Sequence, residues 1–92
     1  MKTIITIDNI YCDDKYIYIQ ANNIYKSPII NGSVSFKVYD NNKNEMYLNN
    51  LNINDKIKIY YTNNFIIQKI ILFCKYEINS DSSDISDTIN YI

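Results

Sequence analysis

The sequence contains no histidine, no arginine and no tryptophan, and it has one glycine, one proline and two cysteines. Without histidine, the commonest general base, the Ser-His and Cys-His pairs of nucleophilic enzymes cannot form. A phosphate-binding loop requires several glycines, and the chain has only Gly32. Two cysteines cannot complete a zinc site, which needs four ligands or three and a water. We therefore expect a protein that is not an enzyme and that uses no metal or other cofactor.

The two cysteines and the lack of a long apolar run bear on location. Cys12 and Cys74 each lie in or beside an apolar run, which predicts two reduced core thiols; a disulfide between neighbouring strands is the alternative. Residues 1–8 are polar every few positions, unlike a signal peptide. No stretch reaches the roughly 20 apolar residues that cross a bilayer. These features predict an intracellular protein without a membrane partner.

Neither sign of charge is in excess, because nine lysines stand against ten acidic residues and the formal net charge is −1. No overall basic field therefore gathers nucleic acid, and such binding would have to use a local patch. Isoleucine, asparagine, lysine and tyrosine dominate the composition, as AT-rich codons would produce. The abundance of tyrosine and asparagine is therefore weak evidence of function by itself.

Two acidic motifs are interpreted as turns. Asp13 and Asp14 are adjacent, and at a turn both side chains simply reach solvent. Residues 40–44 carry oxygen ligands at alternate positions, like the start of a calcium-binding loop. Glu45 stands where that loop requires glycine, and Leu51 where it requires glutamate. We therefore expect a polar hairpin loop at residues 40–44.

Alternation of apolar and polar residues with period two recurs along residues 1–78, which predicts an all-β domain. We expect a small antiparallel barrel or sandwich of five to six strands. The predicted strands are residues 3–11, 15–20, 24–30, 33–39, 56–62 and 65–78. Residues 46–53 fit either a short irregular connection or one helical turn. In residues 33–39, Val34, Phe36 and Val38 are predicted to point inward.

The predicted turns contain asparagine. Asn31-Gly32 adopts positive φ at both positions cheaply, which predicts a tight hairpin. Asn63-Asn64 is predicted to join the last two strands, and the longer second strand must bend or pair with a second partner. Pro28 lacks an N–H donor and is expected at a sheet edge or in a loop.

Residues 79–92 form an acidic tail rich in serine and aspartate, without lysine. Such a composition is typical of disordered segments. The alternative is a short amphipathic helix that forms on docking, because Ile85, Ile89 and Ile92 fall at i, i+4 and i+7. The candidate docking residues of this tail are Ile85, Ile89, Tyr91 and Ile92.

The pattern of residues 32–78 consists of a strand, a connection ending in Leu51-x-x-x-Asp55 and a final hairpin. This pattern resembles the OB-fold, although the helix usual between the third and fourth OB strands is not evident. Residues 54–71 are similar to small uncharacterised proteins of AT-rich large DNA viruses. The resemblances cover about half of the chain and imply an OB-like barrel, located in a host cytoplasm or a virion if the protein is viral.

Lysine and tyrosine side chains on the outward strand positions form the candidate binding surface. Its residues are Tyr16, Tyr18, Lys37, Tyr39, Lys56, Lys58 and Tyr60. Our first hypothesis is a non-enzymatic protein-interaction or structural module, such as a virion or assembly component, with a protein partner or a second copy of itself. The alternative is an OB-like protein whose lysines and tyrosines bind single-stranded nucleic acid. The absence of arginine counts against specific nucleic-acid recognition.

Overall fold

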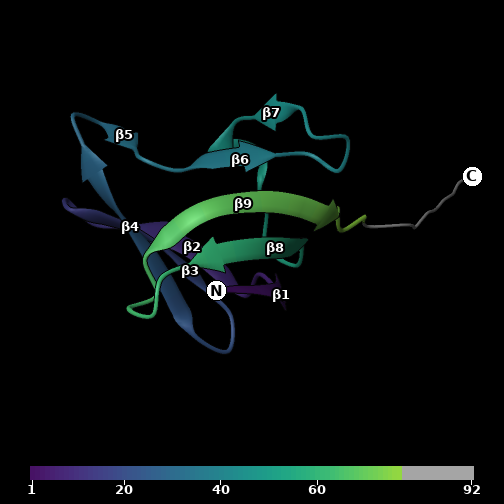
Figure 1. Ribbon diagram of the computed structural model, residues 1–92, viewed down its shortest axis with the longest axis horizontal. Coiled ribbons are helices and arrows are strands. Elements are labelled where there is room, and N and C mark those ends of the chain that lie inside the picture. Colours follow the sequence, from purple (N-terminus) through teal and green to yellow (C-terminus); the bar gives the residue numbers. More distant parts are fainter. Residues whose placement is uncertain (78–92) are drawn as a thin grey trace, which may run out of the picture.

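The computed structural model describes residues 1–77, which form nine strands and one short 3₁₀ helix in two sheets (Figure 1). One sheet has the order β1 (Lys2–Thr6), β8 (Lys56–Tyr61), β9 (Ile67–Cys74), β6 (Lys37–Tyr39) and β7 (Glu45–Met46). The other has the order β2 (Asn9–Cys12), β3 (Tyr16–Gln20), β4 (Ile24–Ile30) and β5 (Ser33–Val34). The helix, η1 (Leu48–Asn50), follows β7. The expected all-β class is confirmed.

Two predicted strands are divided because the chain bends. The predicted strand 3–11 becomes β1 and β2, with Ile7 and Asp8 between them. The Ile7 N–H donates to the Asp55 carbonyl oxygen at 2.9 Å, and the Asp8 N–H donates to the Gln20 carbonyl oxygen at 2.8 Å. The chain therefore crosses from one sheet to the other at these two residues. The predicted strand 33–39 is divided in the same way, at the bend between β5 and β6.

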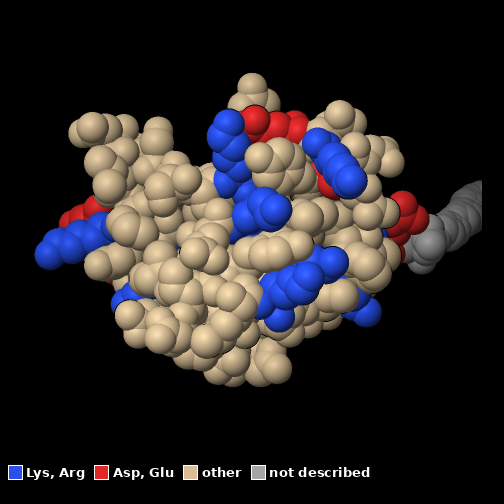
Figure 2. All heavy atoms as spheres, viewed as in Figure 1, with Lys and Arg blue, Asp and Glu red and all other residues tan. Residues whose placement is uncertain are grey.

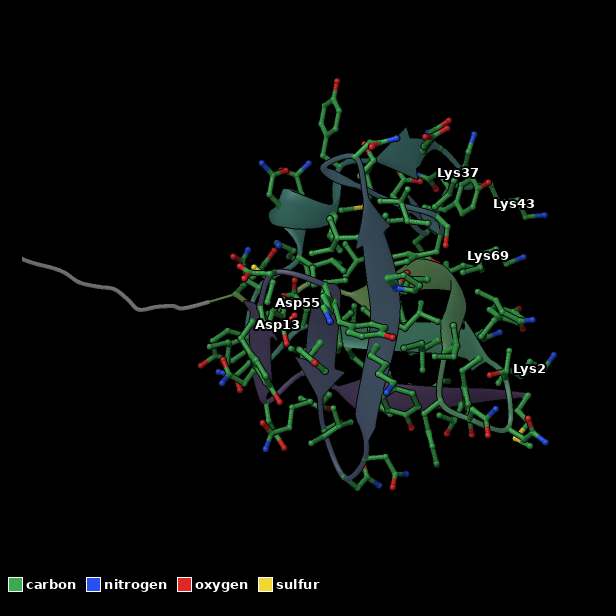
Figure 3. The ribbon with its side chains drawn as sticks, turned by 90° about the vertical axis from the view of Figure 1, so that its left-hand side faces the viewer. Lys2, Asp13, Lys37, Lys43, Asp55 and Lys69 are labelled. Atoms are coloured by element: carbon green, nitrogen blue, oxygen red, sulfur yellow. The ribbon has the colours of Figure 1, made fainter. Side chains whose placement is uncertain are left out.

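Backbone contacts between β4 and the residues just before β9 join the two sheets on the other side of the molecule. The Lys26 N–H donates to the Phe65 carbonyl oxygen at 2.9 Å, and Lys26 forms a parallel bridge with Ile66. In Figure 3, β4 runs between β3 and β9 on the side that faces the viewer. The antiparallel pairs β2·β3, β3·β4, β8·β9 and β1·β8 complete the ring. The predicted small barrel or sandwich is therefore confirmed, and its closure on this side depends on this one parallel contact.

Isoleucine fills most of the interior of the barrel. Ile57 and Ile59 of β8 are fully buried, whereas the lysines that alternate with them point outward. Phe36 and Val38, which were predicted to point inward, are buried, and Val34 is half-buried. The core consists of Ile5, Ile7, Ile19, Tyr25, Phe36, Val38, Leu51, Ile57, Ile59, Ile67 and Ile70. Each large side chain buried here contributes about 1.5–3 kcal/mol of transfer free energy, so this cluster holds the two sheets together.

The last strand, β9, bends and pairs with two other strands, as its length predicts. β9 pairs with β8 in antiparallel orientation and with β6 in parallel orientation. Two register shifts interrupt the β8·β9 pairing, and the strand curves in Figure 1. Bending and a second partner are therefore both confirmed. The parallel orientation was not predicted. It arises because the chain passes through the β4–β5 hairpin of the four-stranded sheet before it enters the five-stranded sheet as β6.

The asparagine turns form as expected. Asn31 has φ of 55° and Gly32 has φ of 78°, and together they make the two-residue hairpin between β4 and β5. Residues 62–66 connect β8 to β9, with the Thr62 N–H donating to the Ile66 carbonyl oxygen at 2.9 Å. Residues 46–53 contain the end of β7 and η1, so of the two predicted alternatives the helical turn is the one that forms.

Pro28 lies inside β4, opposite Tyr16 of β3. Its nitrogen points away from β3, because the N–H of Lys26, two residues earlier, donates toward β9. β5 pairs only with Ile29 and Ile30, so Pro28 lies where that side of β4 has no pairing within the described strands. The position is therefore a local sheet edge, as predicted.

The prediction for the cysteines is wrong. Cys12 and Cys74 are both exposed free thiols instead of core residues. Each is the last residue of its strand, β2 and β9, where the chain leaves the sheet and the apolar run no longer faces the core. An apolar neighbourhood in sequence therefore does not bury a residue at a strand end.

The acidic tail, residues 79–92, lies outside the described residues. Its candidate docking residues are Ile85, Ile89, Tyr91 and Ile92, and the choice between disorder and a docking helix therefore stays a prediction. Within residues 1–77, no helix has the length and apolar content needed to cross a membrane.

Candidate functional site

The seven candidate surface residues divide between the two sheets. Five of them, Lys37, Tyr39, Lys56, Lys58 and Tyr60, lie on the outer face of the five-stranded sheet, alternating with buried residues of β6 and β8. Tyr16 and Tyr18 lie on the outer face of the four-stranded sheet. In Figure 3, the labelled lysines lie along one side of the molecule and Asp13 lies on the other. The predicted surface is therefore two separate surfaces.

Strand register adds two lysines to the first surface. Lys2 of β1 lies opposite Tyr60 of β8, which lies opposite Lys69 of β9, which lies opposite Lys37 of β6. These four residues form a row across four strands, spanning about 15 Å at the usual strand spacing. We define the lysine face as Lys2, Lys37, Tyr39, Lys56, Lys58, Tyr60 and Lys69. The sequence did not identify Lys2 and Lys69, because their proximity depends on pairing between distant strands.

Tyr60 is the centre of the lysine face. The Lys69 ammonium lies 4.5 Å from the centroid of the Tyr60 ring, and the Lys2 ammonium lies 5.9 Å from it. Cation–π contacts of this kind contribute about 0.5–1 kcal/mol at exposed sites. Tyr60 is half-buried, so its ring lies close to two ammonium groups and still contacts solvent. A flat π surface is thus placed beside two positive charges.

The lysine face contains few acidic side chains. Lys37 pairs with Glu45 at 3.5 Å, and both side chains are more than half exposed, so the pair contributes little. Within residues 1–77, the other four lysines of the face form no ion pair. Figure 2 shows lysine side chains over the centre of this face and acidic side chains mostly at its border. Residues 1–77 contain nine lysines and seven acidic residues, so this part of the chain carries a formal charge of +2.

A shallow hollow of about 410 Å³ lies within this surface. Its lining consists of Tyr39, Asp40, Lys43, Tyr60, Lys69 and Ile71. The Asp40 carboxylate accepts the N–H groups of Asn42 and Asn44 at 2.8 and 2.9 Å, so it is occupied in its own loop. The prediction of a polar hairpin loop at residues 40–44 is confirmed. The hollow therefore offers two ammonium groups and two phenol rings to a ligand.

Three tyrosines gather on the outer face of the other sheet. The rings of Tyr11 and Tyr18 stack with centroids 5.0 Å apart, and Tyr16 lies 6.2 Å from Tyr18. The Lys26 ammonium lies 5.0 Å from the centroid of Tyr16. Tyr11 was not among the predicted residues, and its place follows from its register opposite Tyr18. We call these four residues the tyrosine face.

Asp13 is a structural carboxylate of the tyrosine face. It accepts the N–H groups of Lys15 and Tyr16 at 2.8 Å, and these two bonds, followed by the one from the Tyr18 hydroxyl at 2.9 Å, lower the pKa of Asp13. The same hydroxyl bond raises the pKa of Tyr18. The predicted turn at Asp13 and Asp14 is confirmed. With its hydroxyl donated to this turn, Tyr18 presents mainly its ring to a ligand.

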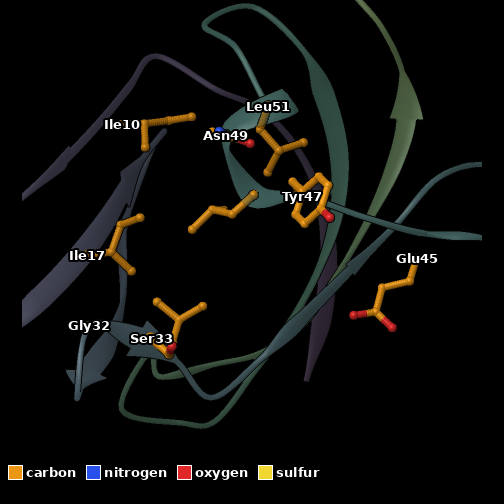
Figure 4. Close-up of a pocket in the computed structure, with 10 residues that line it drawn as sticks. Ile10, Ile17, Gly32, Ser33, Glu45, Tyr47, Asn49 and Leu51 are labelled. Carbon is orange, nitrogen blue, oxygen red and sulfur yellow. The ribbon is translucent and has the colours of Figure 1, made fainter.

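A second hollow, of about 730 Å³, opens between the two sheets. In Figure 4, Ile10 and Ile17 lie on one side of the hollow, Leu51 of the segment after η1 lies on another, and the β4–β5 hairpin closes the third. Leu48 of η1 also lines the hollow. Ile10, Ile17, Val34 and Leu48 also pack against the core. The remaining lining residues are Gly32, Ser33, Glu45, Tyr47 and Asn49. We call this feature the apolar hollow.

Within residues 1–77, no three of the histidine, cysteine or acidic side chains are close enough to hold a metal ion. Comparisons with protein-family models, with curated proteins and with solved structures gave no match. The roles considered below therefore rest on charge, geometry and side-chain chemistry.

Proposed function

We propose that this domain binds single-stranded nucleic acid on the lysine face. The observation that carries this proposal is the position of Tyr60, with the Lys69 and Lys2 ammonium groups 4.5 and 5.9 Å from its ring centroid, in a face of five lysines. Lysine ammonium groups neutralise phosphates, and aromatic rings stack on unpaired bases. An unpaired base on Tyr60 would place its flanking phosphates beside these lysines.

The strand order of the barrel supports the proposal. The barrel runs β1/β2, β3, β4, β9, β8 and back to β1, with a parallel contact between β4 and β9. This order is similar to that of OB barrels, many of which bind oligonucleotides. OB barrels commonly use the face of their second and third strands. Here the equivalent strands, β3 and β4, carry the tyrosine face, which has a single lysine and adjoins Asp13 and Asp14. Charge therefore favours the lysine face.

The same chemistry predicts weak dependence on base sequence. Bidentate recognition of guanine and planar stacking on bases are chiefly arginine functions, and the chain has no arginine. Lysine contacts the phosphate as a point charge, and every base offers a ring face to Tyr60. We therefore propose that binding requires single-stranded nucleic acid, weakens as the salt concentration rises and depends little on base sequence.

A salt titration tests this function directly. A fluorescent oligothymidine of about 16 nucleotides, the upper end of the site sizes of OB domains, is titrated with the full chain at several salt concentrations. With five phosphate contacts, we expect log K to fall against log salt with a slope of about −3.5. Fluorescence anisotropy measures each affinity, and a duplex of the same length is the control. The absence of any anisotropy change at low salt would contradict the proposal.

A second candidate function is association with a protein, including a role in an assembly such as a virion. The edge of β1 supports it, because β1 is the last strand of its sheet and pairs only with β8 among the described strands. Ile4 of β1 is 47% exposed. An open edge with exposed apolar side chains can pair with a strand of another chain.

Homo-assembly through this edge predicts a dimer at micromolar concentration. Light scattering of the full chain should then show a mass that rises with concentration. Ile4→Lys should return the protein to a monomer, because a charge replaces the apolar contact at the edge. Ile24→Lys is the matched control, since Ile24 is equally exposed, at 49%, on the other sheet. A monomer at every concentration would exclude association between copies of this chain.

A further inference from the structure

The apolar hollow has the size of a binding site. Its volume of about 730 Å³ falls within the usual range for ligand sites, about 300–1,000 Å³. Its walls include Ile10, Ile17, Val34 and Leu48, which are half-buried against the core and still reach the hollow. Its acidic rim residue, Glu45, is paired with Lys37. An apolar segment that filled the hollow would therefore cover these side chains without displacing a buried charge.

The described chain ends beside this hollow. The Lys75 ammonium donates to the carbonyl oxygen of Asn50, the last residue of η1, and also contacts the Asp55 carboxylate. The Tyr76 N–H donates to the same carboxylate at 2.9 Å. Leu48 and Asn49 of η1 line the hollow. The chain therefore continues from Glu77 next to the helix that forms one wall.

The residues that follow have the length and the side chains to fill the hollow. Fifteen residues, 78–92, follow Glu77. An extended chain of this length spans about 50 Å, far more than is needed to pass η1. Ile85, Ile89 and Ile92 have the spacing of one helical face, and Ser83 or Asp84 can cap the start of such a helix.

We propose that the segment 78–92 of the same chain docks into the apolar hollow and packs Ile85, Ile89 and Ile92 against Ile10, Ile17 and Leu48. The tether makes docking intramolecular, at an effective concentration of the order of millimolar. This inference is independent of the lysine face, which lies on the outside of the five-stranded sheet.

Nuclear magnetic resonance of the full chain tests the docking. The variant carries Ile85→Asp and Ile89→Asp, which places charges on the proposed contact. Methyl and amide signals of Ile10, Ile17, Val34 and Leu48 should shift relative to the unmodified chain, and the signals of Lys58 and Tyr60 should not. The matched control carries Asp81→Asn, Asp84→Asn and Asp87→Asn, which removes three charges and keeps the isoleucines; it should leave the hollow unchanged.

The outcomes separate the alternatives. Signals of the hollow that do not respond to the Ile85 and Ile89 changes would overturn the proposal. A response of the lysine face to the aspartate changes, with no response of the hollow to the Ile85 and Ile89 changes, would also overturn it and would place the acidic segment over the lysines. The shifts must be the same at tenfold lower protein concentration, since shifts that vanish on dilution would show docking between chains. Oligonucleotide binding is measured separately, so neither proposal depends on the other.

Discussion

Replacement of Asp55 by alanine should lower the free energy of unfolding by about 3 kcal/mol, the cost of disrupting a buried, hydrogen-bonded carboxylate. The Asp55 side chain is fully buried. It accepts the N–H groups of Asn52 and Tyr76, each at 2.9 Å, and pairs with the Lys75 ammonium at 3.0 Å. Alanine removes the acceptor of two backbone donors. Because Lys75 is 41% exposed and can turn to water, most of the loss comes from those two donors.

The effect is large for a domain of this size. A chain of 92 residues is stabilised by roughly 5–14 kcal/mol in total, so about 3 kcal/mol is a substantial fraction. Urea denaturation monitored by circular dichroism measures the change. Asp14→Ala is the matched control, because Asp14 is exposed and its carboxylate makes no hydrogen bond within residues 1–77. Equal stabilities for the two variants would show that the Asp55 contacts do not hold the fold.

The same carboxylate should make stability depend on pH. Burial alone would raise the pKa of Asp55, but the N–H donors of Tyr76 and Asn52 and the Lys75 ammonium outweigh it and lower the pKa below its ordinary 3.8. The stabilisation is therefore fully present above pH 3.8, the unfolded-state value, and is lost as the pH falls through the lower folded-state value. The Asp55→Ala variant should lose less stability than the unmodified protein over that acid range.

The contacts of Asp55 also show how far the sequence determines the fold. The motif Leu51-x-x-x-Asp55 was apparent before the structure, but its role was not. Asp55 ties the connection before β8 to the end of β9, and its partner Tyr76 is 21 residues away. Alternation of side chains is a local property, so the sequence predicted the strands and the Asn31-Gly32 turn. The parallel contact at Lys26 is non-local and could not be predicted.

The prediction of the candidate surface was limited in the same way, because contacts between distant strands could not be predicted. Outward-facing positions follow from period two, and all seven predicted residues do alternate with inward-facing ones. Which of them become neighbours depends on strand order. In the structure, Lys2 and Lys69 are therefore neighbours of Tyr60, and Tyr11 is a neighbour of Tyr18. The sequence indicated none of these contacts. A surface predicted from alternation alone is a set of candidates, and strand pairing decides which of them form one site.

Reversing two charges on the lysine face should have the largest effect on nucleic-acid binding. Lys56 and Lys58 are alternate residues of β8 and point the same way as Tyr60. Lys56→Glu with Lys58→Glu replaces two attractions to phosphate by two repulsions. At low salt we expect the affinity for oligothymidine to fall about 1,000-fold, since each reversal removes about 1 kcal/mol of attraction at about 4 Å and adds about 1 kcal/mol of repulsion. The salt slope should also decrease in magnitude, from about 3.5 to about 2.

A double variant of equal charge change is the control. Lys15→Glu with Lys26→Glu alters net charge by the same amount on the side of the tyrosine face, and it should weaken binding far less. The reverse result would place the nucleic acid on β3 and β4 and exclude the lysine face.

Tyr60→Ala separates stacking from charge. It should weaken binding by about 5- to 150-fold, the range of one stacked base, and leave the salt slope unchanged. Loss of affinity together with a smaller slope would instead mean that Tyr60 acts by positioning Lys2 and Lys69.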